Sequence, residues 1–215
     1  MWNLNEYEKF VWNQKRRQEF MERAFRPPPP LPRDELSLNN FIDWLLEPPD
    51  FRLFAYKHAT SEIAPTSFID SITRQRPSRI FCDRLLDGTP REFEDLVATF
   101  FRQLGGQVVN GNRGADGAID ALWNTPSGDY IVQCKRRKKN IGEPVIREIF
   151  GVAANSTARG AFIVVASGFS SNATRFVEGL KPRIGLINGE ELFNLMSLVM
   201  PTEAREIQNR SPKKK

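Results

Sequence analysis

The chain has 215 residues, a formal net charge of +5, 40% hydrophobic residues, 27% charged residues and a single histidine. It contains no run near the roughly 18 apolar residues of a membrane helix and no apolar signal segment at its N-terminus, so we expect a cytoplasmic protein without a membrane partner. One histidine and two cysteines exclude sites built on several imidazoles, a disulfide framework and a thiolate zinc cluster. Any catalysis by this chain would therefore depend on carboxylates, lysine and a hard metal ion.

The first 80 residues are predicted to form an N-terminal helical extension. Residues 5–25 have the composition of an amphipathic helix, which stops at a proline-rich linker over residues 27–32 because consecutive prolines favour extended backbone. A second helix is predicted over residues 34–47, with its apolar residues on one face, and it ends before Pro48. Residues 51–80 carry no readable pattern.

From Pro90 onward, the pattern indicates an α/β domain over residues 81–202. Thr89 is a predicted N-cap, Pro90 suits the first helical position, and Gly105 ends the helix. The strands predicted after it cover residues 107–111, 119–123, 130–135, 161–167 and 183–187, and the further helices cover residues 143–158, 170–180 and 189–200. A hairpin followed by alternating helices and strands predicts a mixed β-sheet flanked by helices on both faces. Residues 203–215 are expected to be a disordered basic tail.

The strand over residues 130–135 begins apolar and ends with Gln133 and Lys135 on one face. If Trp123 pairs with Tyr130 across the hairpin, Asp120 lies opposite Gln133, with Cβ atoms about 5 Å apart, and Lys135 lies diagonally from it. Carboxylate, amide and backbone carbonyl oxygens suit Mg²⁺, and a nearby lysine can orient or deprotonate a water. A structural ion pair between Asp120 and Lys135, with Gln133 as its hydrogen-bonded neighbour, is an equally consistent interpretation.

Several motifs in this half of the chain resemble one family. "REFEDLVATFFRQLGG", "GADGAID", "IVQCKR" and "GAFIVVASGFSSNA", followed by "IGLINGEELFNLM", are similar to the catalytic domain of Mrr-type restriction endonucleases, a branch of the PD-(D/E)XK nucleases whose last motif is Gln-x-Lys. The resemblance covers approximately residues 85–200 and implies a restriction-endonuclease-like mixed sheet flanked by helices.

The resemblance also implies roles for individual residues. Asp120 matches the metal-binding aspartate, Gln133 a second metal ligand, and Lys135 the catalytic lysine. Glu94 matches the acidic residue of the first helix that often completes the metal shell, and the backbone carbonyl of Cys134 would be a further ligand. The implied cofactor is Mg²⁺, with Mn²⁺ as a possible substitute.

Asp116 is a rival carboxylate in the glycine-rich loop before Asp120. It precedes the strand, and Asp is a common turn residue because its side chain hydrogen-bonds to nearby backbone. We therefore expect Asp116 to shape the turn.

The implied substrate is double-stranded DNA, cut by metal-dependent phosphodiester hydrolysis in restriction or anti-phage defence. Four cations directly after the active-site strand are expected to contact DNA phosphates: Arg136, Arg137, Lys138 and Lys139. One active site cuts one strand, so a homodimer or a subunit of a larger defence complex is expected. Two alternatives stay open, namely a structure-specific resolvase of branched DNA and a DNA-binding nuclease subunit that is latent until a partner activates it.

Overall fold

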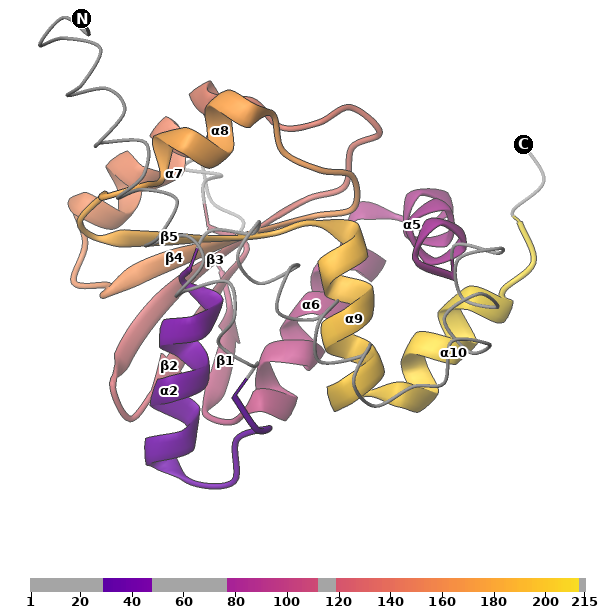
Figure 1. Ribbon diagram of the computed structural model, residues 1–215, viewed down its shortest axis with the longest axis horizontal. Helices are drawn as coiled ribbons and strands as arrows, with labels where there is room; N and C mark the ends of the chain where they lie inside the picture. Colours follow the sequence, from indigo (N-terminus) through magenta and orange to yellow (C-terminus); the bar gives the residue numbers. More distant parts are fainter. Residues whose placement is uncertain (1–28, 48–76, 112–118, 213–215) are drawn as a thin grey trace, which may run out of the picture.

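The computed structural model describes residues 29–47, 77–111 and 119–212. A single five-stranded sheet lies between two layers of helices (Figure 1). The strand order is β1-β2-β3-β4-β5, with antiparallel pairing from β1 to β3 and parallel pairing from β3 to β5. The strands are β1 Gln107–Asn110, β2 Ala121–Thr125, β3 Gly128–Lys135, β4 Gly160–Val165 and β5 Arg183–Ile187. The predicted mixed sheet is confirmed.

The register of the β2–β3 hairpin decides which residues meet at its open end. Trp123 pairs with Tyr130, as predicted, and Ala121 pairs with Val132. One step beyond this last pair, Asp120 and Gln133 are opposite each other. Because side chains alternate between the faces of a sheet, Gln133 and Lys135 point to the same face as Ile131.

Helices cover both faces of the sheet and divide its core in two. The helices α7 (Glu143–Ala154) and α8 (Ser171–Phe176) enclose one core with the face that carries Ile131. Five helices contribute to the core on the other face (Figure 1): α2 Glu35–Leu45, α5 Pro77–Asp87, α6 Pro90–Leu104, α9 Gly189–Val199 and α10 Pro201–Asn209. Among the described residues, no helix has the length and apolar character needed to cross a membrane.

An aromatic cluster joins α6 to the middle of the sheet. The ring of Phe101 lies 4.8 Å from Trp123 and 5.4 Å from Phe162, measured between ring centroids. Trp123 also donates from Nε1 to the carbonyl of Gly105, at 2.7 Å. At its start, α6 has the predicted N-cap Thr89, whose hydroxyl accepts from the Glu92 amide at 3.1 Å. The helix that carries Glu94 is thus fixed at both ends.

The N-terminal helix α2 is present as predicted and packs in the core on one face of the sheet. Its apolar residues, including Phe41 and Leu45, are buried in the same core as α6. Arg183 of β5 pairs with Asp43 at 3.2 Å and with Glu47 at 3.5 Å. The predicted domain boundary at residue 80 falls inside α5 and is therefore misplaced, because α2 and α5 share the core of the domain. The predicted helix over residues 5–25 lies outside the described residues.

The chain after residue 200 corrects another prediction. Residues 203–209, expected to begin a disordered tail, belong to α10, which starts with Pro201 in its first turn. Ala204 is 1% exposed and Ile207 2% exposed, and both pack in the core next to α9. Only two apolar residues mark this helix among many charged ones, so its docking was hard to predict from the residue pattern.

Truncating Ile207 tests whether α10 is an integral part of the domain. We expect Ile207→Ala to lower the free energy of unfolding by about 2–5 kcal/mol, because it leaves a cavity in a packed core. Glu206→Ala, at an exposed neighbouring position, should change it by less than about 0.5 kcal/mol. Urea denaturation of both variants measures the difference. Equal stability of the two would contradict the docking of α10.

Candidate active site

Asp120 is held at the open end of the β2–β3 hairpin by two hydrogen bonds. The Gln133 amide donates from Nε2 to Asp120 Oδ2 at 2.6 Å, and the backbone N–H of Cys134 donates to the same oxygen at 2.7 Å. The pairing of Asp120 with Gln133, predicted from strand alternation, is therefore present. One carboxylate oxygen is fixed by two donors from a central strand, so the orientation of the carboxylate is well defined.

Gln133 is an unusual residue for the middle of a sheet. Its side chain is only 1% exposed, and Nε2 also lies 3.5 Å from the backbone carbonyl of Cys134. Its other terminal atom, Oε1, is buried and has no hydrogen-bond partner in the described part of the chain. Buried polar atoms are nearly always paired, so the Gln133 amide leaves its acceptor unsatisfied in the orientation that donates to Asp120.

These groups fit a hard divalent cation. The Asp120 carboxylate, the Gln133 amide oxygen and the Cys134 carbonyl are oxygen donors of the kind that Mg²⁺ accepts, together with several waters. No group of three or more His, Cys, Asp or Glu side chains suited to a metal occurs among the described residues. The predicted ligand set differs from such a cluster, because two of its donors are an amide and a backbone carbonyl.

The thiol of Cys134 is unsuited to the ligand role. Burial raises its pKa well above the ordinary value for cysteine, and the negative charges of Asp120 and Glu94 raise it further, while Lys135 acts in the opposite direction. The thiol therefore stays protonated near neutral pH, and a protonated thiol is a poor metal ligand. If Cys134 binds a cation, it does so through its backbone carbonyl.

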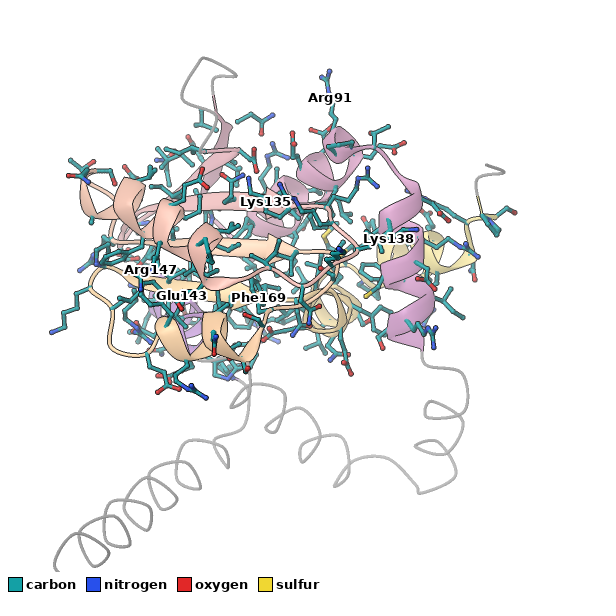
Figure 2. All side chains as sticks on the ribbon, turned by 90° about the horizontal axis from the view of Figure 1, so that it is seen from above. Arg91, Lys135, Lys138, Glu143, Arg147 and Phe169 are labelled. Atoms are coloured by element: carbon teal, nitrogen blue, oxygen red, sulfur yellow. The ribbon has the colours of Figure 1, made fainter. Side chains whose placement is uncertain are left out.

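Glu94 and Lys135 lie around the same end of β3. The charge of Glu94 raises the pKa of the Cys134 thiol and that of Lys135 lowers it, so both act on the residue next to Gln133. Glu94 is half-buried on α6, and Lys135 is half-buried as the last residue of β3, opposite Val165 of β4. Figure 2 shows Lys135 near the centre of the molecule in the view from above. The predicted residues therefore come from one helix and from the end of the β2–β3 hairpin.

A purely structural ion pair between Asp120 and Lys135 would account for only part of this geometry. It would explain a half-buried carboxylate at the same strand end as a lysine, with Gln133 as a hydrogen-bonded neighbour. It gives no reason for Gln133 to be buried with an Oε1 that no described residue pairs, whereas an amide that turns Oε1 toward a bound cation would pair it. The rival carboxylate Asp116 lies outside the described residues.

The cationic run after β3 divides into a structural residue and three exposed ones. Arg136 is half-buried and donates from Nη1 to the carbonyl of Leu86, in the last turn of α5, at 2.5 Å. Arg137, Lys138 and Lys139 are exposed. The prediction treated all four as DNA contacts. Arg136 also has a structural partner, because its guanidinium donates to a carbonyl 50 residues earlier in the chain, which the local sequence does not reveal.

The loop that carries the exposed cations is braced by the loop after β4. Ile141 donates its amide to the Gly168 carbonyl at 2.8 Å, and the Ser170 amide donates to the Ile141 carbonyl at 2.9 Å. The Ser167 hydroxyl donates to the Lys139 carbonyl at 3.0 Å. These bonds hold the backbone of the cationic loop in one position beside β3. No sequence motif predicted them.

Arg136 and Lys138 provide a matched test of this division. We expect Arg136→Ala to lower the free energy of unfolding by about 1–3 kcal/mol, because it leaves the Leu86 carbonyl without its donor. Lys138→Ala, at an exposed position, should lower it by less than about 0.5 kcal/mol. Thermal or urea unfolding of the two variants decides the point, and identical stabilities would contradict the structural role of Arg136.

The fold and this site together define a class of protein. A carboxylate before β2, a Gln-x-Lys end to β3, and a sheet that changes from antiparallel to parallel at β3 are the features of a PD-(D/E)XK nuclease domain. Residues 85–196, more than half of the chain, match the family described as restriction endonuclease, of the Mrr catalytic type. The chain belongs to this family, as its sequence motifs predicted.

One curated relative is the type IV methyl-directed restriction enzyme EcoKMrr of Escherichia coli strain K12. It is 29% identical over 124 residues, which are 53% of this chain and 40% of that enzyme. The chain thus matches about two fifths of the relative's length.

Solved structures of restriction endonucleases have a similar fold. The DNA modification-dependent restriction endonuclease AspBHI matches 63% of this chain and 39% of its own, with a TM-score of 0.52 and 13% sequence identity. The MspJI restriction endonuclease, in a complex with a 27-mer oligonucleotide, matches with a TM-score of 0.37, which is too low to add to the assignment. The first of these likenesses supports the restriction-endonuclease-like fold.

Proposed function

We propose that the chain is a metal-dependent endonuclease that hydrolyses phosphodiester bonds of double-stranded DNA, in restriction or anti-phage defence. The observation that carries the proposal is the hydrogen bond between Asp120 and the buried side chain of Gln133, two residues before Lys135. Membership of the restriction endonuclease family agrees with it. EcoKMrr and AspBHI, both named as restriction enzymes, point to DNA as the substrate class.

Three oxygen donors would hold the cation. They are the Asp120 carboxylate, the Gln133 amide oxygen and the backbone carbonyl of Cys134. This cation would be Mg²⁺, with Mn²⁺ as a possible substitute. When bound, such an ion polarises the scissile phosphate and lowers the pKa of an attacking water. The hydrogen bond from the Cys134 amide to Asp120 Oδ2 orients the carboxylate for this role before any substrate arrives.

Lys135 would act on the water and on the phosphate. It leaves the sheet on the same face as Gln133, and it is half-exposed, so its ammonium group can reach a substrate at the strand end. As an ammonium it can orient the nucleophile and offset the negative charge that develops on the phosphate oxygens, and only in its neutral amine form could it take up the proton of the water. Glu94, on the neighbouring helix, would complete the metal shell, directly or through water.

Arg137, Lys138 and Lys139 would bind the phosphates that flank the scissile bond. Replacing all three with alanine should weaken binding of duplex DNA and reduce the slope of log K against log salt by about 0.9 for each phosphate left without its cation. Fluorescence anisotropy with a labelled duplex at several salt concentrations measures both quantities. As a control, replacing Arg102 and Arg205, exposed on α6 and α10, should leave the slope unchanged. An unaltered slope in the triple variant would contradict this interface.

Cutting both strands of a duplex requires two active sites, so the chain would act as a homodimer or as a subunit of a larger complex. Incubation of the purified protein with linear, supercoiled and branched DNA in Mg²⁺ tests the activity. Cleavage of duplex DNA supports the proposal. Cleavage of branched DNA alone would favour a resolvase, and inactivity on all three would favour a subunit that a partner activates.

A further inference from the structure

The amide of Gln133 is oriented with its donor, not its acceptor, toward the predicted metal ligands. Nε2 lies 2.6 Å from Asp120 Oδ2 and 3.5 Å from the carbonyl oxygen of Cys134. The acceptor Oε1 is buried and has no hydrogen-bond partner among the residues that the structure describes. The –NH₂ group of Gln133 therefore occupies the point where the two other oxygen ligands converge.

We propose that Gln133 is a reversible cap on the metal site, and that cation binding requires its amide to turn over and exchange Nε2 for Oε1. The inference rests on the proposed metal-dependent function. It adds that the –NH₂ group of Gln133 and the cation compete for the Asp120 carboxylate. In one orientation the amide donates to the carboxylate. In the other, three oxygen atoms face one point, an arrangement that a bound cation stabilises.

Rotation of the amide is possible inside this packed sheet. The terminal torsion of glutamine is broad and roughly two-fold, and –NH₂ and oxygen are nearly equal in size, so a half-turn needs little extra space. The hydrogen bond from the Cys134 amide to Asp120 Oδ2 does not depend on the rotation. The carboxylate therefore keeps its position while the ligand beside it changes.

The cap should reduce the affinity of the site for metal. A hydrogen bond to a charged acceptor is worth about ten- to a hundredfold in an equilibrium constant, and metal binding must give up the one between Gln133 and Asp120. Glutamate at position 133 has no –NH₂ group to donate and adds a negative charge. We therefore expect Gln133→Glu to bind Mg²⁺ or Mn²⁺ at least about tenfold more tightly than the wild type.

Nuclear magnetic resonance of the ¹⁵N-labelled full chain observes the rotation directly. The side-chain NH₂ signals of Gln133 are identified by their loss in Gln133→Glu. Upon saturation with Mg²⁺, they should shift and exchange faster with solvent, because the donor leaves the Asp120 carboxylate. The NH₂ signals of Gln103 and Gln107, both exposed, should not move.

Calorimetric titration of the metal gives the second measurement, with Gln107→Glu as a control that adds the same charge at an exposed position of β1. Tighter binding by Gln133→Glu, together with the shift of the Gln133 signals, would support the cap. Measurable binding with unmoved Gln133 signals, or an affinity of Gln133→Glu equal to that of the control, would overturn the cap and leave the proposed function intact. An absence of metal binding in the wild type would overturn both.

Discussion

Asp120→Ala should reduce the rate of DNA cleavage by at least about a thousandfold, because it removes the charged ligand of the proposed cation site. The same change leaves the Gln133 amide and the Cys134 N–H without their shared acceptor. We therefore also expect a loss of about 1–3 kcal/mol in the free energy of unfolding. Plasmid cleavage in Mg²⁺ and urea denaturation measure the two effects.

Two further variants separate the chemistry of Asp120 from its structural role. Asp120→Asn keeps an acceptor oxygen for the hydrogen bonds, so it should recover most of the stability while cleavage stays low. Asp129→Asn changes a carboxylate at the closed end of the same hairpin, where it accepts from Asn124 at 2.7 Å, and should retain cleavage. Full cleavage by Asp120→Asn would show that this carboxylate does not hold a catalytic cation.

Lys135→Ala is expected to lower cleavage by about a hundred- to a thousandfold while the protein remains folded. Lys135 is half-exposed at the end of β3, so its truncation leaves no core cavity. The affinity for duplex DNA should change severalfold at most, since only one of several cations is removed. The comparison of the cleavage rate at saturating DNA with the binding constant from anisotropy distinguishes catalysis from binding.

Lys135→Arg and Arg102→Ala complete this experiment. Arginine keeps the positive charge but cannot give up a proton near neutral pH and is larger, so it should not restore the full rate. Arg102, exposed on the last turn of α6, should be replaceable without effect on cleavage. A Lys135→Ala protein as active as Arg102→Ala would exclude a catalytic role for the lysine.

The part of the site that depends on strand alternation could be predicted from the sequence. A period of two places Gln133 and Lys135 on one face, and the turn after Trp123 sets the register that brings Asp120 opposite Gln133. Both are local properties of a hairpin. The N-cap and the end of α6 were likewise predictable, because Thr89, Pro90 and Gly105 act on neighbouring backbone.

The features that the sequence did not reveal depend on distant partners. Arg136 looks like its cationic neighbours until Leu86 is brought to it by the packing of α5. The docking of α10 depends on Ile207 reaching the core near α9, and that of α2 on Phe41 and Leu45 reaching the core that they share with α6. The orientation of the Gln133 amide follows from a balance of hydrogen bonds that no residue pattern encodes.

The dependence of DNA cleavage on divalent cation tests the central claim most directly. The initial rate of plasmid cleavage by the wild-type chain would be measured across a range of Mg²⁺ concentrations and in excess EDTA. The proposed site predicts a rate that rises to saturation with Mg²⁺, that falls to background in EDTA, and that yields 5′-phosphate and 3′-hydroxyl ends. Cleavage at an undiminished rate in EDTA would contradict it.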